Sequence, residues 1–152
     1  MTQAWKTLAI ALCLVCPGLG IAADENPDEE AAHIRHALME LMGWNMKTVA
    51  AMSTDKQPYN QAQAEIHGQR LAALAGMISD AFARDTSGSD VKTEALDAIW
   101  LNQTEFEMNA VKLGEAASNY AAATAENEAA AKKAFVTLGG SCKGCHEEFK
   151  AE

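Results

Sequence analysis

The sequence has few of the residues that build β-sheets or interrupt helices. Aromatic residues make up only 6% of the 152 residues, and the only prolines are Pro17, Pro27 and Pro58. Because strands favour aromatic and β-branched side chains, this composition argues against a strand-rich fold. Hydrophobic residues make up 49% of the chain and charged residues 22%, which excludes a disordered protein.

Basic residues are also scarce, with 12 lysines and arginines against 21 acidic residues and a formal net charge of −9. Such an acidic chain is a poor match for nucleic acid, whose partners carry basic patches, and for an anionic membrane surface. A length of 152 residues suits a single domain.

The first 23 residues have the pattern of a secretory signal. Lys6 provides a basic start, residues 8–21 are largely apolar, and small residues up to Ala23 precede an acidic stretch. The apolar part is short for a membrane-spanning helix, which needs about 20 residues. We therefore expect cleavage after Ala22 or Ala23, no stable membrane anchor, and a domain formed by residues 24–152.

The four cysteines occur as two C-x-x-C pairs, and cleavage of the signal removes one of them. Cys13 and Cys16 leave with the signal, so Cys142 and Cys145 alone remain in the exported protein. Lys6 leaves too, which makes the formal charge −10 from Asp24 onward. Export implies an oxidising compartment, most simply a bacterial periplasm.

The exported part carries four long stretches with helical periodicity. Met39, Met42 and Met46 illustrate it in the first stretch, where apolar residues recur every three or four positions. We predict an all-α fold, an antiparallel four-helix bundle, which holds cofactors between facing helices. The expected helices cover about 28–52, 59 or 60 to 82, 102–123, and from 124–127 nearly to the end, with a short helical turn within 96–100.

The residues Cys142-Lys143-Gly144-Cys145-His146 form a C-x-x-C-H motif, the signature of covalent c-type haem attachment. On a helix, the spacings of three and four place both thiols and the imidazole on one side. Cys142 and Cys145 can then bind the haem vinyl groups as thioethers, with His146 as the proximal iron ligand. We expect one covalently attached haem c.

Three other interpretations of this motif are weaker. A thioredoxin-like redox pair needs a βαβ context, which the sequence does not offer. A zinc site needs four ligands, and His67 would complete the set only by chance. A plain disulfide is the simplest alternative, but an exported chain with a C-x-x-C-H motif favours haem attachment. A lone histidine such as His67, on an apolar helix face, is more often a core residue.

The distal side of the iron has several candidate ligands. Met39 lies in the apolar stripe of the first helix, and His/Met ligation raises the potential of a haem. Met42 and Met46 share that stripe, and spacing alone does not choose among the three. His36 is a stronger ligand type but lies about 60° around the helix from Met39.

Arg35 lies one turn before Met39 on the same face, where its guanidinium is a candidate partner for a haem propionate. The alternative is a solvated arginine. Lys150 follows His146 by four residues and is either a neighbour of the proximal ligand or a terminal charge.

The exported chain resembles class II cytochrome c, the cytochrome c′ family, over nearly its whole length. That family is a four-helix bundle with C-x-x-C-H in its last helix, as in Ser141–His146 here. Ile34-Arg35 with the apolar residues after it resembles the family's first helix, Gln57–Asn60 resembles its entry to the second, and Ile99-Trp100 resembles its approach to the third.

The resemblance implies that the distal side of the iron has one of two forms, either an apolar residue that does not bind the iron or a methionine that does. In cytochrome c′ proper an apolar residue usually stands four residues after the first-helix arginine, and the five-coordinate iron binds nitric oxide or carbon monoxide. In the low-spin cytochrome c-556 type a methionine stands there and ligates the iron. Counting four from Arg35 reaches Met39, so the chain resembles the low-spin type, although Leu38 is adjacent.

We therefore predict a periplasmic monohaem electron carrier, not an enzyme, because no nucleophile or acid–base group accompanies the haem motif. Its expected partner is a redox protein with a basic docking face, because a charge of −10 steers such encounters. The protein itself is a monomer or a homodimer. The alternatives are a gas-binding cytochrome c′ and a periplasmic copper-binding protein that uses Met39, Met42 and Met46.

Overall fold

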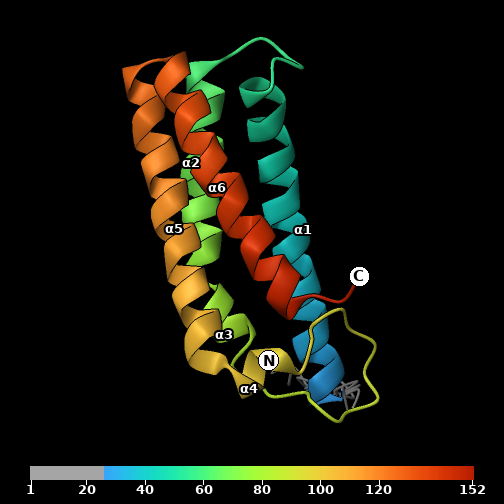
Figure 1. The fold of residues 1–152 in the computed structure, drawn as a ribbon. Helices are drawn as coiled ribbons and strands as arrows, with labels where there is room; N and C mark the ends of the chain where they lie inside the picture. The colour runs from blue at the N-terminus through green and yellow to red at the C-terminus, as the bar shows by residue number, and fades with distance from the viewer. Residues whose placement is uncertain (1–25) are drawn as a thin grey trace, which may run out of the picture.

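The computed structural model describes residues 26–152 and contains four long helices and two short ones. The long helices are α1 (Pro27–Ser53), α2 (Gln61–Ala75), α5 (Gln103–Glu126) and α6 (Glu128–Phe149), and the short ones are α3 (Ile78–Ala81) and α4 (Ala98–Leu101). Successive long helices run in opposite directions (Figure 1). The predicted all-α antiparallel four-helix bundle is confirmed. The predicted signal peptide, with Cys13, Cys16 and its cleavage site, lies outside the described residues.

Asparagine side chains cap three of the long helices. Asn26 accepts a hydrogen bond from the amide of Asp28, Asn60 from Gln63, and Asn127 from Ala130. Such caps satisfy amides that have no partner within the helix. The predicted starts of these helices agree with the structure to within a few residues.

The second predicted helix is shorter than expected. The sequence pattern indicated one helix to about residue 82, but α2 ends at Ala75 and α3 begins at Ile78. The last turn of α2 tightens at this point, where the amide of Met77 donates to the carbonyl of Leu74, only three residues before it, at 3.0 Å. The apolar spacing continues across this break, because Ile78 and Phe82 are also buried in the core.

The long helices α1 and α6 approach each other less closely than the other neighbouring pairs. The core is packed mainly between α2 and α5, and between α5 and α6. Leu71, Tyr120 and Leu138 are essentially inaccessible to solvent. The space between α1 and α6 is where the bundle is open. Within residues 26–152, no helix is long and apolar enough to cross a membrane.

Candidate haem-binding site

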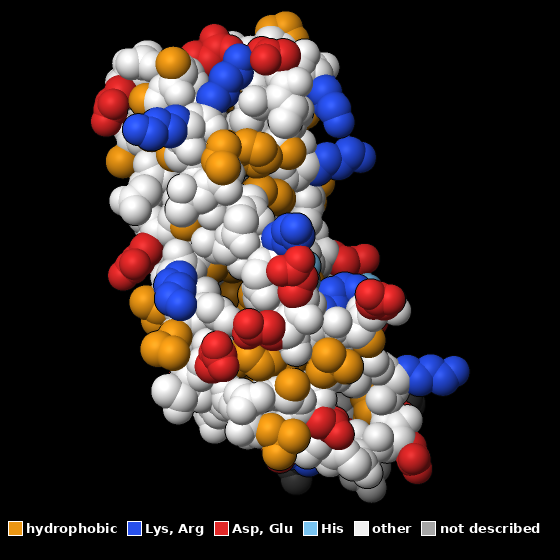
Figure 2. All heavy atoms as spheres, viewed as in Figure 1, with side chains coloured by type: hydrophobic (Ala, Val, Ile, Leu, Met, Phe, Trp, Pro, Cys, Tyr) orange, Lys and Arg blue, Asp and Glu red, His pale blue; other side chains and the backbone are white. Residues whose placement is uncertain are grey.

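A cavity of about 1130 Å³ opens beside the C-x-x-C-H motif. Its volume slightly exceeds the roughly 300–1,000 Å³ of common ligand pockets. Hydrophobic side chains are visible between charged ones on the face shown in Figure 2. The wall includes side chains from α1 (Met39, Met42, Met46), α5 (Phe106, Ala110, Leu113), α6 (Cys142, Cys145, His146, Phe149) and the segment between α3 and α4 (Asp90–Ala95).

The structure brings Cys142, Cys145 and His146 together on the cavity side of α6, as their spacing predicted. Both cysteines are free thiols and half-buried. Burial raises the pKa of the Cys142 thiol, and it raises the pKa of Cys145 to about 11. Both groups are therefore protonated thiols near neutral pH.

His146 lies on the same wall and is exposed at the mouth of the cavity. Burial lowers its pKa, and the nearby Lys150 ammonium lowers it further, whereas Glu94 acts in the opposite direction. The neutral imidazole is the form that ligates a metal, so this environment favours the proposed proximal role.

On α1 the cavity wall includes all three stripe methionines. Met39 and Met46 are half-buried and Met42 is buried. Leu38, the neighbour that would otherwise compete for the distal position, is 5% exposed, packs in the core, and is absent from the wall among the described residues. His36 lies at the rim, exposed and 3.4 Å from Glu40. Which of these groups ligates the iron stays a prediction.

Arg35 is a buried cation on the cavity wall, with only 3% of its surface exposed. It is therefore not the solvated arginine that the sequence left open. Its Nε donates to the carbonyl of Ala81 at 3.0 Å and its Nη1 to Thr86 Oγ1 at 2.8 Å, and its Nη2 donates to the carbonyl of Arg84. The rings of Phe82 and Trp100 lie 5.2 and 5.0 Å from the guanidinium carbon.

These contacts leave the charge of Arg35 without a direct counter-ion. Within the described residues, no carboxylate forms an ion pair with it, and burial lowers its pKa. Within the described residues, two of its five N–H groups have no hydrogen-bond partner. A buried cation beside an apolar cavity suits an acidic cofactor, so the residues present are compatible with a haem and its propionates. The propionate contact itself stays a prediction.

The sequence model of the family described as Cytochrome C′ matches residues 30–150. The chain belongs to the cytochrome c′ family. Members of this family bind covalently attached haem c, and the predicted resemblance to class II cytochrome c is confirmed. The C-x-x-C-H motif, which predicts haem attachment, therefore lies where the cavity opens.

The chain is similar to relatives named cytochrome c′ and to relatives named cytochrome c-556. A cytochrome c′ of Pararhodospirillum photometricum is 38% identical over 80% of this chain and 97% of its own. A cytochrome c-556 of Agrobacterium tumefaciens is 29% identical over 76% of this chain and 93% of its own. A solved cytochrome c′ described by its ligand-controlled dimer dissociation is 32% identical, with a TM-score of 0.74 over 82% of this chain and 97% of that one.

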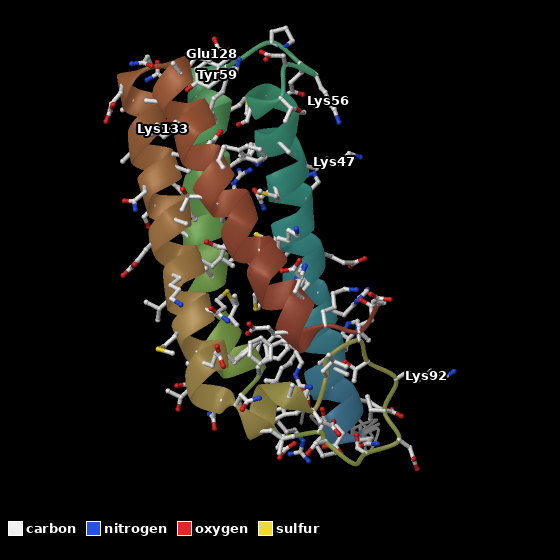
Figure 3. All side chains as sticks on the ribbon, viewed as in Figure 1. Lys47, Lys56, Tyr59, Lys92, Glu128 and Lys133 are labelled. Carbon is white, nitrogen blue, oxygen red and sulfur yellow. The ribbon has the colours of Figure 1, made fainter. Side chains whose placement is uncertain are left out.

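Sequence reasoning missed the segment between α3 and α4 as a wall of the cavity. Residues Asp90–Ala95 line it, and Ala95 forms an isolated antiparallel bridge with Lys150. Lys150 is 3.1 Å from Glu94, so it is not simply a frayed terminal charge. In the structure Lys92 projects outward from this segment (Figure 3). The sequence of this segment has no helical or strand periodicity, so it gave no sign that the segment lines the cavity.

His67 is a satisfied core residue, as its place on an apolar face suggested. It is 8% exposed, its Nδ1 lies 2.7 Å from Asn45 Oδ1, and its ring meets the edge of Trp44 with centroids 5.3 Å apart. Asn45 in turn donates to the carbonyl of Leu41. Because its Nδ1 already has a partner on α1, His67 is not a candidate fourth ligand for a zinc site with Cys142, Cys145 and His146.

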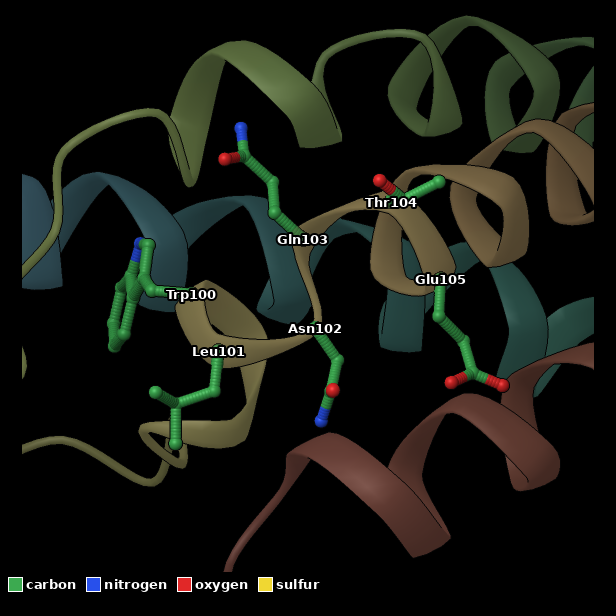
Figure 4. Close-up of a pocket in the computed structure, with 6 residues that line it drawn as sticks. All are labelled: Trp100, Leu101, Asn102, Gln103, Thr104 and Glu105. Atoms are coloured by element: carbon green, nitrogen blue, oxygen red, sulfur yellow. The ribbon is translucent and has the colours of Figure 1, made fainter.

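A second hollow, of about 410 Å³, lies where α4 meets α5 and is lined by residues 100–105. The side chains of Asn102, Gln103 and Glu105 point in different directions and do not converge on one point (Figure 4). This hollow therefore lacks the convergent polar groups that mark a binding site.

Proposed function

We propose that this protein is a periplasmic monohaem electron carrier in which Cys142 and Cys145 hold the haem and His146 and Met39 ligate its iron. When bound, the haem supplies an iron that gains or loses one electron. The apolar wall from α1 and α5 excludes water, and His146 presents a neutral imidazole. The periplasmic location rests on the signal-like pattern of residues 1–23.

The observation that carries this proposal is the difference between two neighbouring residues of α1. Met39 lines the cavity that also contains Cys142, Cys145 and His146, whereas Leu38 is buried in the core. A thioether at this position supports a closed sixth coordination site. His/Met ligation favours an electron carrier because it raises the haem potential and leaves no open position for a gas.

Carbon monoxide tests the proposal directly. The optical spectrum of the reduced protein is recorded with and without the gas, for the wild type and for Met39→Leu, Met42→Leu and Met46→Leu. We expect only Met39→Leu to be readily converted by carbon monoxide. Ready conversion of the wild type would refute ligation by Met39, and conversion confined to Met42→Leu or Met46→Leu would move the ligand to that residue.

The second candidate is a five-coordinate cytochrome c′ that binds nitric oxide or carbon monoxide. Relatives named cytochrome c′ favour it, including the one from P. photometricum. The copper-binding alternative has less support, because Met42 is buried and all three stripe methionines share their cavity with the haem-attachment residues.

We further propose that the protein forms a homodimer through α1 and α2. Large apolar side chains on these helices are exposed, namely Ile34 (48%), Leu41 (51%), Trp44 (57%) and Ile66 (48%). A second copy is the occupant we favour, because a solved relative is described as a dissociating dimer. Light scattering on Leu41→Glu/Trp44→Glu should show monomers, with Val111→Glu on α5 as the control. A wild type that is already monomeric would disprove the homodimer.

A further inference from the structure

Arg35 joins α1 to a segment far away in the sequence. Its three nitrogens donate to three different residues, Ala81, Arg84 and Thr86, and not to one partner. The rings of Phe82 and Trp100 flank the same guanidinium. Trp100 also donates through Nε1 to the carbonyl of Phe82 at 3.1 Å, which closes the cluster.

The segment that starts in this cluster continues along the cavity. After Thr86 the chain runs through Asp90–Ala95, which line the wall. Its far end is fastened to the end of α6, where the amide of Leu96 donates to the carbonyl of Phe149 at 3.0 Å. The amide of Ala151 donates to the carbonyl of Glu94 at 2.8 Å. Residues 87–93 therefore connect two anchors, of which Arg35 is one, and residues 90–93 among them line the cavity.

We propose that Arg35 is a positioning residue that clamps residues 81–86 to α1 and thereby holds in place the wall that residues 90–95 form at the proposed haem cavity. This inference rests on the proposed haem function of the cavity and is distinct from a contact between Arg35 and a propionate. The clamp determines how much water reaches the cavity, and the hydrophobic shell of a haem in turn affects its reduction potential.

Only arginine suits this geometry. The guanidinium presents five N–H groups in a rigid plane, so it reaches three separate oxygens while its faces pack against aromatic rings. A lysine in the same place keeps the charge but is a compact point donor without a flat face. Arg35→Lys therefore separates the clamp from simple charge, because a propionate is attracted by either cation.

The chain contains a built-in probe for this clamp. Lys92 lies exposed in the wall segment, and Lys56 lies exposed in the connection between α1 and α2 at the other end of the bundle (Figure 3). Trypsin cleavage of the haem-loaded protein at each lysine reports local opening at that place, since proteolysis follows the population of the open form. The ratio of cleavage at Lys92 to that at Lys56 is the readout.

We expect Arg35→Lys and Thr86→Val to raise this ratio by roughly tenfold or more, which corresponds to losing a hydrogen bond to a charged group. The exposed Arg70 provides the control variant, Arg70→Gln, whose ratio should match the wild type. Thr86→Val leaves Arg35 intact, and it should also lower the reduction potential because water then reaches the cavity and favours the more highly charged ferric state.

An unchanged cleavage ratio in Thr86→Val would overturn the clamp, and so would an equal rise at Lys56 and Lys92, which signals general destabilisation. The proteolysis readout does not depend on which residue ligates the iron. Failure of the clamp and failure of the Met39 proposal, which carbon monoxide tests, are therefore distinguishable.

Discussion

Gly68 sets the distance between the two most closely packed helices. A Cβ at this position would lie 2.9 Å from Cδ1 of Tyr120 and 3.1 Å from Cα of Ala121, and the second of these atoms belongs to the backbone of α5. Tyr120 is fully buried and has no room to yield. We expect Gly68→Ala to destabilise the protein by about 1–3 kcal/mol, the usual cost of overpacking, as measured by urea unfolding.

The control for this prediction is Gly140→Ala in α6. A Cβ there would meet nothing within 4 Å, and the residue is exposed. Alanine is the better helix former, so this variant should gain up to about 1 kcal/mol. If both glycine variants changed the free energy of unfolding alike, close packing at Gly68 would not be the cause.

The buried His67 makes stability depend on pH. Burial lowers the pKa of its imidazole, and the Arg70 guanidinium lowers it further. The unfolded chain, where a histidine has a pKa of about 6.5, then binds the proton more readily than the folded protein. The stabilisation is present above that pH and is lost as the pH falls through 6.5 towards the lower folded pKa.

Unfolding by urea at pH 7.5 and pH 5.5 measures this effect. We expect His67→Gln to show a smaller loss of stability between the two pH values than the wild type, since glutamine does not titrate. The difference between the proteins isolates His67 from other titrating groups such as His146. Equal losses in both proteins would show that His67 has the same pKa in the folded and unfolded states.

At the scale of whole elements, the start of α6 depends on one side chain. Asn127 separates α5 from α6, and its Oδ1 accepts from the amide of Ala130 at 2.9 Å. Asn127→Ala should therefore cost about 1 kcal/mol in thermal or urea unfolding. Asn119→Ala in the exposed middle of α5 is the control and should cost nothing. Equal costs would indicate that Asn127 does not act as a cap.

Elements with local signals could be predicted from the sequence, and those held by distant contacts could not. Asn26 with Pro27 marks the start of α1, and the C-x-x-C-H spacing places three site residues on one face of α6. The three stripe methionines of α1 also line the cavity, as their shared helix face indicated. These features depend only on residues close together in the chain.

The cavity wall between α3 and α4 is different, because its place is determined by residues far away in the sequence. Arg35 and Thr86 are 51 positions apart, and Ala95 pairs with Lys150 near the C-terminus. The sequence of residues 83–97 has no periodicity that would predict either contact. The end of α2 was misplaced for a related reason, since apolar spacing continued through the break at Gly76 and concealed it.

For the whole molecule, the acidic charge is concentrated at one end. When each long helix is divided at its middle, the half with the cavity mouth (26–40, 68–114 and 139–152) carries 14 acidic and 7 basic residues. The other half (41–67 and 115–138) carries 5 acidic and 4 basic residues. The net charges are −7 and −1, so the molecule has a strong electrostatic polarity along its axis.

This polarity predicts how redox partners approach. The 27 residues of α1 span about 40 Å, and the Debye length is only about 8 Å at physiological salt, so a partner near the haem is influenced mainly by the nearer end. A basic docking face is therefore guided to the cavity end, where we propose that the haem is attached. Small redox reagents provide a test that requires no knowledge of the natural partner.

We expect a cationic ruthenium ammine complex to exchange electrons with the protein faster at low salt, and ferricyanide to do so more slowly. Asp90→Lys with Asp97→Lys at the cavity end should weaken both salt dependences, because both residues are exposed there. Glu115→Lys with Glu126→Lys changes the net charge equally in the distant half and serves as the control. If the two double variants altered the rates alike, net charge rather than its location would guide the encounter, and the docking face would not be confined to the haem end.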